Sequence, residues 1–225
     1  MYLVNFCIAI NIISAFVQCD DITKQSDLSS TIKSNDEHQI TNEDTDMTAV
    51  EKVNVKIYYE TLCPYCINFF VYYLQPEIVS LHKYLNIRLY PYGNAETKEE
   101  GDHYEITCQH GESECYGNKL HACAIDIIKN VTKSTLYNCC LMGNQSDDNA
   151  ATECGVQMKI DADPIKECAK SDKGNQLLKD YGEKSMYVGY PGVPFILVDG
   201  KTSSADVFKK DICEAFIEPP PPCKT

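Results

Sequence analysis

Residues 53–74 read VNVKIYYETLCPYCINFFVYYL, and this stretch predicts a strand that is followed at once by a helix. Apolar residues alternate with more polar ones from Val53 to Tyr59, which is the two-residue period of a strand. After CPYC, apolar residues recur at the spacing of one helical face. The two cysteines of CPYC therefore lie at the turn from a strand into a helix.

The CPYC pair is placed for redox chemistry. Its two-residue spacing puts the sulfurs of Cys63 and Cys66 at the first helical turn, where unpaired N–H groups and the helix dipole favour a thiolate. Such sites lower a cysteine pKa from about 8.5 to roughly 3.5–7.5. We expect Cys63 to be the nucleophile and Cys66 to resolve the mixed disulfide. The alternatives are a structural disulfide or half of a zinc site, but zinc usually needs a second such pair, and no metal is expected.

The elements after CPYC predict an α/β fold. Helical spacing continues to Leu85, with Pro76 expected to end or kink the helix, and residues 86–90 read as a second strand. Near the other end, an apolar strand at 195–198 runs into the hairpin signal Asp199-Gly200 and a helix at 205–216. This order predicts a thioredoxin-like fold. A disulfide-rich, mainly helical region is inserted at about 101–161, and a further helix is expected over 163–181.

Val193-Pro194 stands directly before the late apolar strand. In thioredoxin-like folds, a cis-proline at this place in the element order lies beside the CxxC and exposes backbone to the substrate chain. Only about 5–6% of X-Pro bonds are cis, so the expectation of a cis bond here rests on its position before the late strand. Val193 and Pro194 are therefore the predicted substrate-binding residues.

Composition narrows the class of protein. The chain has 225 residues, 13 cysteines and a formal net charge of −13. Cysteines at this density suit an oxidising compartment. An acidic balance disfavours nucleic-acid binding, which needs a basic face.

The chain divides into a leader, an acidic segment and a folded body. Residues 1–19 carry no charged side chain and contain an apolar run, so they predict a cleaved signal peptide. Residues 20–52 are acidic and polar, and predict a disordered linker or pro-segment. The folded body is expected over 53–223, with no membrane span in the mature chain. Asn130 and Asn144 head two N-glycosylation sequons inside it.

A longer motif points to a family. Residues 108–123 read CQHGESECYGNKLHAC, which resembles the signature CQHGxxECxxNxxxxC of the gamma-interferon-inducible lysosomal thiol reductase (GILT) family at every specified position. The resemblance covers roughly residues 53–223. It also includes Tyr58-Tyr59-Glu60, Pro91-Tyr92-Gly93-Asn94-Ala95, Glu167-Cys168-Ala169, Val193-Pro194 and Val198-Asp199-Gly200.

The resemblance implies an enzyme of the secretory pathway, lysosomal or extracellular, that reduces disulfide bonds of protein substrates at acidic pH. It carries over Cys63 and Cys66 as the redox pair. No bound cofactor is expected, and turnover would need an external thiol reductant. His110 is either a proton shuttle or a structural residue of the signature turn. The competing functions are a disulfide oxidase or isomerase on the same fold, and a non-catalytic secreted binding protein.

The remaining cysteines of the folded body are expected to form structural disulfides. Their number is odd, so one is free or pairs between chains. Cys223 follows a run of prolines that favours an extended tail, and we weigh a disulfide-linked homodimer through it. The alternative is a Cys213–Cys223 bond with Cys139 or Cys140 left free. The structural candidates are Cys108, Cys115, Cys123, Cys139, Cys140, Cys154, Cys168, Cys213 and Cys223.

Overall fold

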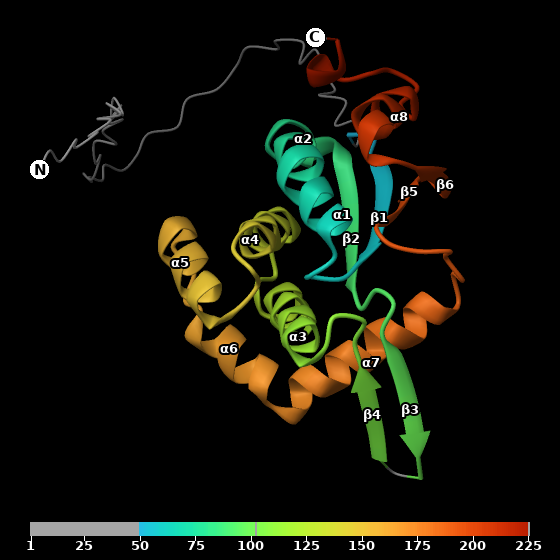
Figure 1. The fold of residues 1–225 in the computed structure, drawn as a ribbon. Helices are drawn as coiled ribbons and strands as arrows, with labels where there is room; N and C mark the ends of the chain where they lie inside the picture. Colours follow the sequence, from blue (N-terminus) through green and yellow to red (C-terminus); the bar gives the residue numbers. More distant parts are fainter. Residues whose placement is uncertain (1–49, 102, 225) are drawn as a thin grey trace, which may run out of the picture. The chain divides into compact units, whose positions relative to one another are not determined.

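The central sheet has the strand order β2-β1-β5-β6 in the computed structural model, which describes residues 50–101 and 103–224 (Figure 1). β1 (Val53–Tyr59) pairs in parallel with β2 (Leu85–Pro91) and antiparallel with β5 (Phe195–Val198). β5 turns back into β6 (Lys201–Ser203), which confirms the predicted hairpin. The expected signal peptide and most of the expected acidic segment lie outside the described residues.

One face of the sheet packs against the helix that follows CPYC. This helix consists of α1 (Pro64–Asn68), a π-helical segment (Phe69–Leu74) and α2 (Gln75–Leu81). α8 (Phe208–Glu214) packs against it, with the ring of Phe208 5.1 Å from that of Phe69. Val55, Ile57 and Ile196 are buried in the same core. Burial of such side chains contributes roughly 1.5–3 kcal/mol each, and it holds the start of α1 at the end of β1.

Pro76 does not end the helix, contrary to one expectation. The backbone changes to π-helical spacing over Phe69–Leu74 and returns to α-helix at Gln75, so that Pro76 lies in the first turn of α2. Proline has no N–H to donate, and this position requires none. The helix therefore continues to Leu81 and the apolar face stays on the sheet.

A hairpin and a group of helices lie between β2 and β5. They are β3 (Glu96–Glu100), β4 (His103–Thr107), α3 (Glu112–Ile127), α4 (Val131–Gly143), α5 (Asp148–Met158), α6 (Asp163–Lys170) and α7 (Asp172–Met186). The hairpin projects past α7 (Figure 1). The stretch at 101–161, which we expected to be mainly helical, lies within this region. The sequence analysis did not predict the hairpin.

The single helix expected over 163–181 is two helices that meet at Ser171. Its backbone N–H and its hydroxyl both donate to the carbonyl of Cys168, at 3.0 and 2.8 Å, which closes α6. Gly174 then lets α7 start close to α6, because a Cβ there would lie 2.5 Å from the same carbonyl oxygen. α7 continues to the opposite face of the sheet, where Tyr181 meets Tyr90 edge to face.

Candidate active site

Cys63 and Cys66 lie where the sequence predicted, at the N-terminus of α1. Cys63 is the N-terminal capping residue, Pro64 is the first helical residue, and the Ile67 N–H donates to the Cys63 carbonyl at 3.0 Å. Cys63 is 7% exposed and Cys66 is fully buried. A substrate sulfur can therefore approach Cys63 but not Cys66.

The two thiols have opposite acidities. A hydrogen bond from the Cys66 thiol, backbone N–H groups of Cys66 and Tyr65, and the nearby His110 lower the pKa of Cys63 to about 6. Burial raises the pKa of Cys66 far above its ordinary value, and its hydrogen bond to Cys63 adds to this effect. The site is arranged to hold a thiolate on Cys63 and a proton on Cys66.

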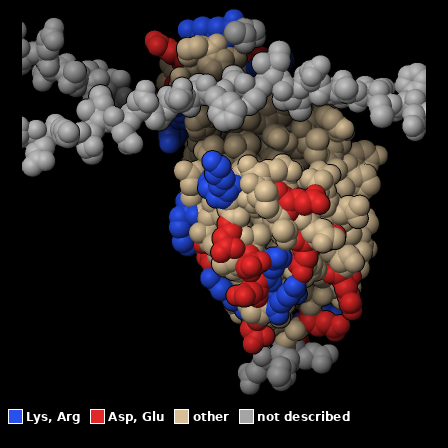
Figure 2. All heavy atoms as spheres, turned by 90° about the vertical axis from the view of Figure 1, so that its left-hand side faces the viewer, with Lys and Arg blue, Asp and Glu red and all other residues tan. Residues whose placement is uncertain are grey.

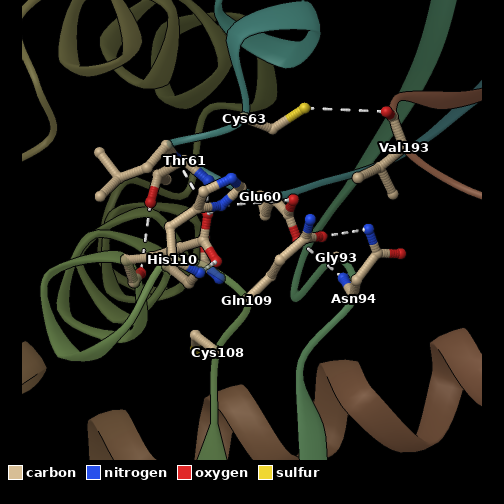
Figure 3. A network of polar contacts seen from close by, with 12 residues as sticks. Glu60, Thr61, Cys63, Gly93, Asn94, Cys108, Gln109, His110 and Val193 are labelled. Atoms are coloured by element: carbon tan, nitrogen blue, oxygen red, sulfur yellow. Dashed lines mark hydrogen bonds and ion pairs between the residues drawn. The ribbon is translucent and has the colours of Figure 1, made fainter.

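Val193 and Pro194 lie beside the Cys63 sulfur. The Val193-Pro194 peptide bond is cis, as its place in the element order predicted. The Cys63 Sγ is 3.8 Å from the Val193 carbonyl oxygen and points toward it (Figure 3). Packing of β5 beside β1 creates this contact between distant parts of the chain.

Figure 3 shows Glu60 and His110 near Cys63, and Glu114 forms a cluster with them. The His110 Nδ1 is 2.6 Å from Glu114 Oε2 and 3.7 Å from Glu60 Oε1. Both carboxylates are buried, and the His110 side chain is 34% exposed. The hydrogen bond with Glu114 is the main cause that raises the pKa of His110, and the charges of Glu60 and Cys63 add to it.

Backbone contacts fix both carboxylates in place. The Asn94 N–H donates to Glu60 Oε2 at 2.8 Å, and a Cβ on Gly93 would lie 2.2 Å from the same oxygen. Glu114 accepts the N–H groups of His110 at 3.0 Å and Leu62 at 3.3 Å. Gly93 is also held at a φ of 67°, a region that favours glycine. The PYGNA and CQHG motifs thus supply backbone groups that hold the two carboxylates next to the dithiol.

Glu60 and Glu114 were not among the predicted site residues. Both belong to motifs on which the family resemblance rests, and this membership could have identified them as site residues. Sequence alone could not distinguish a site role for His110 from a role in the turn. The structure brings all three side chains to the dithiol.

The same three side chains are close enough to be tested as a metal site, since their ligand atoms lie within 4.8 Å of one another. Zinc bonds of about 2.0–2.2 Å at tetrahedral angles would hold two ligand atoms about 3.3 Å apart. The His110 Nδ1 and Glu114 Oε2 are only 2.6 Å apart, which is a charge-assisted hydrogen bond. The arrangement fits an ion pair better than a chelate.

Comparison with known proteins decides the family. The family model described as gamma interferon inducible lysosomal thiol reductase (GILT) matches residues 54–158. GILT-like protein 2 of Drosophila melanogaster is 32% identical over 66% of this chain and 70% of its own length. The chain belongs to the GILT family.

Other comparisons agree with this assignment. The gamma-interferon-inducible lysosomal thiol reductase-like protein of Anopheles gambiae is 40% identical, over 59% of this chain and 60% of that protein. A thioredoxin-like oxidoreductase from Silicibacter pomeroyi superposes with a TM-score of 0.51 at 13% identity, covering 74% of this chain and 87% of that one, and confirms the fold. This GILT-family chain is therefore classed with the thiol–disulfide oxidoreductases, and it spans 60–70% of the length of the two insect relatives.

The disulfides of this GILT-family chain correct two expectations. Cys139 is a buried free thiol and not a disulfide partner, because it faces the sheet core while its neighbour Cys140 faces α5. Cys223 bonds Cys213, which contradicts the homodimer through Cys223 and confirms the alternative of a Cys213–Cys223 bond with Cys139 left free. The proline tail is not fully extended, because it folds into a 3₁₀ turn over Pro221–Cys223. The pairs are Cys108–Cys115, Cys123–Cys168, Cys140–Cys154 and Cys213–Cys223.

The two sequons differ in their surroundings. Asn130 and Asn144 are both exposed. The Asn130 side chain caps α4 by accepting the Lys133 N–H at 2.9 Å. Asn144 donates through Nδ2 to the Cys140 carbonyl at 2.9 Å, and its sequon hydroxyl on Ser146 is buried against His121. Glycosylation at either site stays a prediction.

The surface over α5 and α6 carries interspersed charges of both signs (Figure 2). Lys166 pairs with Asp163 at 2.8 Å, and Lys170 with Asp148 at 2.5 Å. The described residues of this face therefore form no continuous basic surface. Within the described part of the chain, none of the helices has the length and apolar character needed to cross a membrane.

Proposed function

We propose that this GILT-family chain reduces disulfide bonds of protein substrates at acidic pH in the endocytic pathway. The observation that carries the proposal is the place of Cys63 at the N-terminus of α1, beside the Glu60–His110–Glu114 cluster, and these surroundings lower its pKa to about 6. At pH 5, a thiol with this pKa is about one-tenth thiolate, whereas an ordinary thiol is ionised to only about 0.03%. The site thus retains a nucleophile where most thiols have none.

The reaction has two exchange steps. The Cys63 thiolate attacks a substrate sulfur, which breaks the substrate disulfide, forms a mixed disulfide and releases one substrate thiolate. Cys66 then loses its proton and attacks the Cys63 sulfur, which releases the second thiolate and leaves a Cys63–Cys66 disulfide. An external thiol reductant restores the dithiol, and no bound cofactor takes part.

The backbone beside Cys63 is proposed to hold the substrate chain. The Val193 carbonyl lies 3.8 Å from the Cys63 sulfur, just before β5 begins at Phe195. Tyr65 is 78% exposed next to the dithiol and offers apolar contact. These features suit an unfolded protein substrate more than a small disulfide.

A disulfide oxidase on the same site is the second candidate. A stabilised Cys63 thiolate also stabilises the reduced enzyme, which is the property that makes a dithiol protein an oxidant. Equilibration with glutathione measures the reduction potential. A value above the endoplasmic reticulum poise of about −180 to −210 mV would favour the oxidase.

Trapping experiments test the reductase at pH 5. Cys66→Ser should accumulate mixed disulfides with a disulfide-containing protein, because the resolving thiol is gone, and Cys63→Ser should accumulate none and lose activity. Cys139→Ala is the matched control for the third free thiol and should behave as wild type. Mass spectrometry identifies the linked cysteine. Trapping through Cys66 in the Cys63 variant would reverse the roles.

A further inference from the structure

Reduction of a disulfide consumes two protons, because two thiols leave as products. The reduced dithiol holds only one proton when Cys63 is ionised, and that proton is on the buried Cys66. A second proton must come from water or from a group in the site. A residue in the site that stores this second proton could donate it to a departing substrate thiolate, and no water molecule would then be needed as the donor.

Glu60 is the carboxyl group best placed to store it. It follows β1 directly, is 1% exposed, and its backbone makes a hydrogen bond to the Cys66 thiol. Its Oε2 is occupied by the Asn94 N–H, and its Oε1 faces the His110 ring at 3.7 Å. The titratable groups that face it from neighbouring elements are Cys63, Cys66, His110, Glu114 and Tyr190.

The cluster of Glu60, Glu114 and protonated His110 carries a net negative charge unless one carboxylate binds a proton. Two buried carboxylates share one imidazolium, and the 2.6 Å hydrogen bond assigns it to Glu114. Glu60 is left without a full counter-charge. Burial first, and then the charges of Glu114 and Cys63, raise the pKa of Glu60 to about 7.

His110 connects Glu60 to the surface. Glu114 holds its ring and its backbone N–H, while a third of the side chain remains exposed. The Cys108–Cys115 disulfide closes the short loop on which His110 and Glu114 are carried. The ring therefore lies between the buried Glu60 carboxyl group and solvent.

We propose that Glu60 stores the second proton for disulfide reduction, and that His110, anchored by Glu114, transfers it between Glu60 and the departing substrate thiolate. This inference rests on the proposed reductase function and assigns its acid–base residue. Glu114 is a positioning residue, since it acts through the His110 ring.

The two steps balance in protons and electrons. When the Cys63 thiolate attacks, the first departing thiolate takes a proton from the His110 imidazolium, and Glu60 returns one to the ring. The Glu60 carboxylate then accepts the Cys66 proton as Cys66 attacks the Cys63 sulfur. That proton goes through His110 to the second departing thiolate. The dithiol supplies both electrons, Cys66 and Glu60 supply one proton each, and an external thiol restores both protons on re-reduction.

The test compares Glu60→Gln with Glu112→Gln, which removes an exposed carboxylate nearby. Gln can still accept the Asn94 N–H, so the fold contact is kept while the proton store is lost. Single-turnover reduction of a protein disulfide by reduced enzyme is measured from pH 4.5 to 8.5. We expect Glu60→Gln to be about 100-fold slower at pH 5 and to lack the ionisation near pH 7. Glu112→Gln should match wild type.

Two further readouts separate proton transfer from damage to the site. Alkylation of Cys63 needs no proton donor, so Glu60→Gln should alkylate at least as fast as wild type. His110→Asn keeps a donor for Glu114 but removes the titrating ring, and it should lose at least 10-fold in reduction at pH 5. Wild-type reduction kinetics in either variant would overturn the inference. If wild type and Cys63→Ser are equally inactive at every pH, the reductase proposal itself fails.

Discussion

The sheet region and the helical region of this protein are stabilised in different ways. The core between the sheet, α1–α2 and α8 is built from large side chains such as Phe69, Phe70 and Leu74, and two free thiols of the active site lie in it. The core among α3–α6 is built largely from alanines and from cysteines in disulfides. Small side chains bury little area each, so the helical region depends more on covalent links. Cys63 and Cys66 thus lie in the region whose core is built from large side chains rather than from disulfide-bonded cysteines.

Removal of the Cys123–Cys168 disulfide should have the largest effect on stability. It joins α3 to α6 across 45 residues, and the loop-entropy relation gives about 4 kcal/mol for that length. The Cys213–Cys223 bond closes only 10 residues beside the sheet region, and the same relation gives about 2.7 kcal/mol. Urea unfolding of the two double-alanine variants measures both. Equal losses, or a larger loss for the second, would contradict the contrast between the regions.

The pH dependence of stability tests the boundary between the regions, where Glu60 of the sheet region faces His110 and Glu114 of the helical region. The pKa of Glu60 is about 7 in the folded protein against 4.5 for the free group. The folded state therefore binds the proton more tightly, and the stabilisation is complete below pH 4.5 and is lost as pH rises through 7. Wild type should lose about 3 kcal/mol relative to Glu60→Gln between pH 4 and 8.

Unfolding of both reduced proteins by urea at each pH gives this difference. Glu112→Gln serves again as the control, and its difference from wild type should stay flat across the range. A flat difference for Glu60→Gln as well would show that Glu60 titrates alike in the folded and unfolded chains.

The adjacent cysteines of α4 give the smallest predicted effect. Cys139 is a free thiol packed in the sheet-region core, so Cys139→Ala should cost only about 1 kcal/mol. Cys140→Ala breaks a bond that closes 14 residues, which should cost about 3 kcal/mol. Thermal unfolding of the oxidised variants compares them. A larger loss for Cys139→Ala would show that the free thiol is more than a packing group.

Several elements were predictable because their signals are local. The alternation from Val53 to Tyr59, the helix start at Pro64 and the Asp199-Gly200 turn each depend on a few neighbouring residues. The hairpin at β3 and β4 was missed because β3 (ETKEE) has no apolar residue, and the alternation in β4 (HYEIT) rests on Tyr104 and Ile106 alone. The break at Ser171 was missed because Gly174 decides it by close approach to α6, which no periodicity records.

By itself, the sequence determined the strands β1, β2 and β5, the position of the dithiol at a helix start and the family, because periodicity, capping and a motif of fixed spacing are properties of adjacent residues. Only the tertiary structure decided which cysteines pair and which one stays free, since a disulfide requires Cα atoms about 4.4–6.8 Å apart. It also decided that Glu60, directly after β1, meets His110 from the turn before α3 and Glu114 from the first turn of α3. That meeting depends on how α3 packs beneath the sheet, and packing is set by the whole core rather than by any one segment.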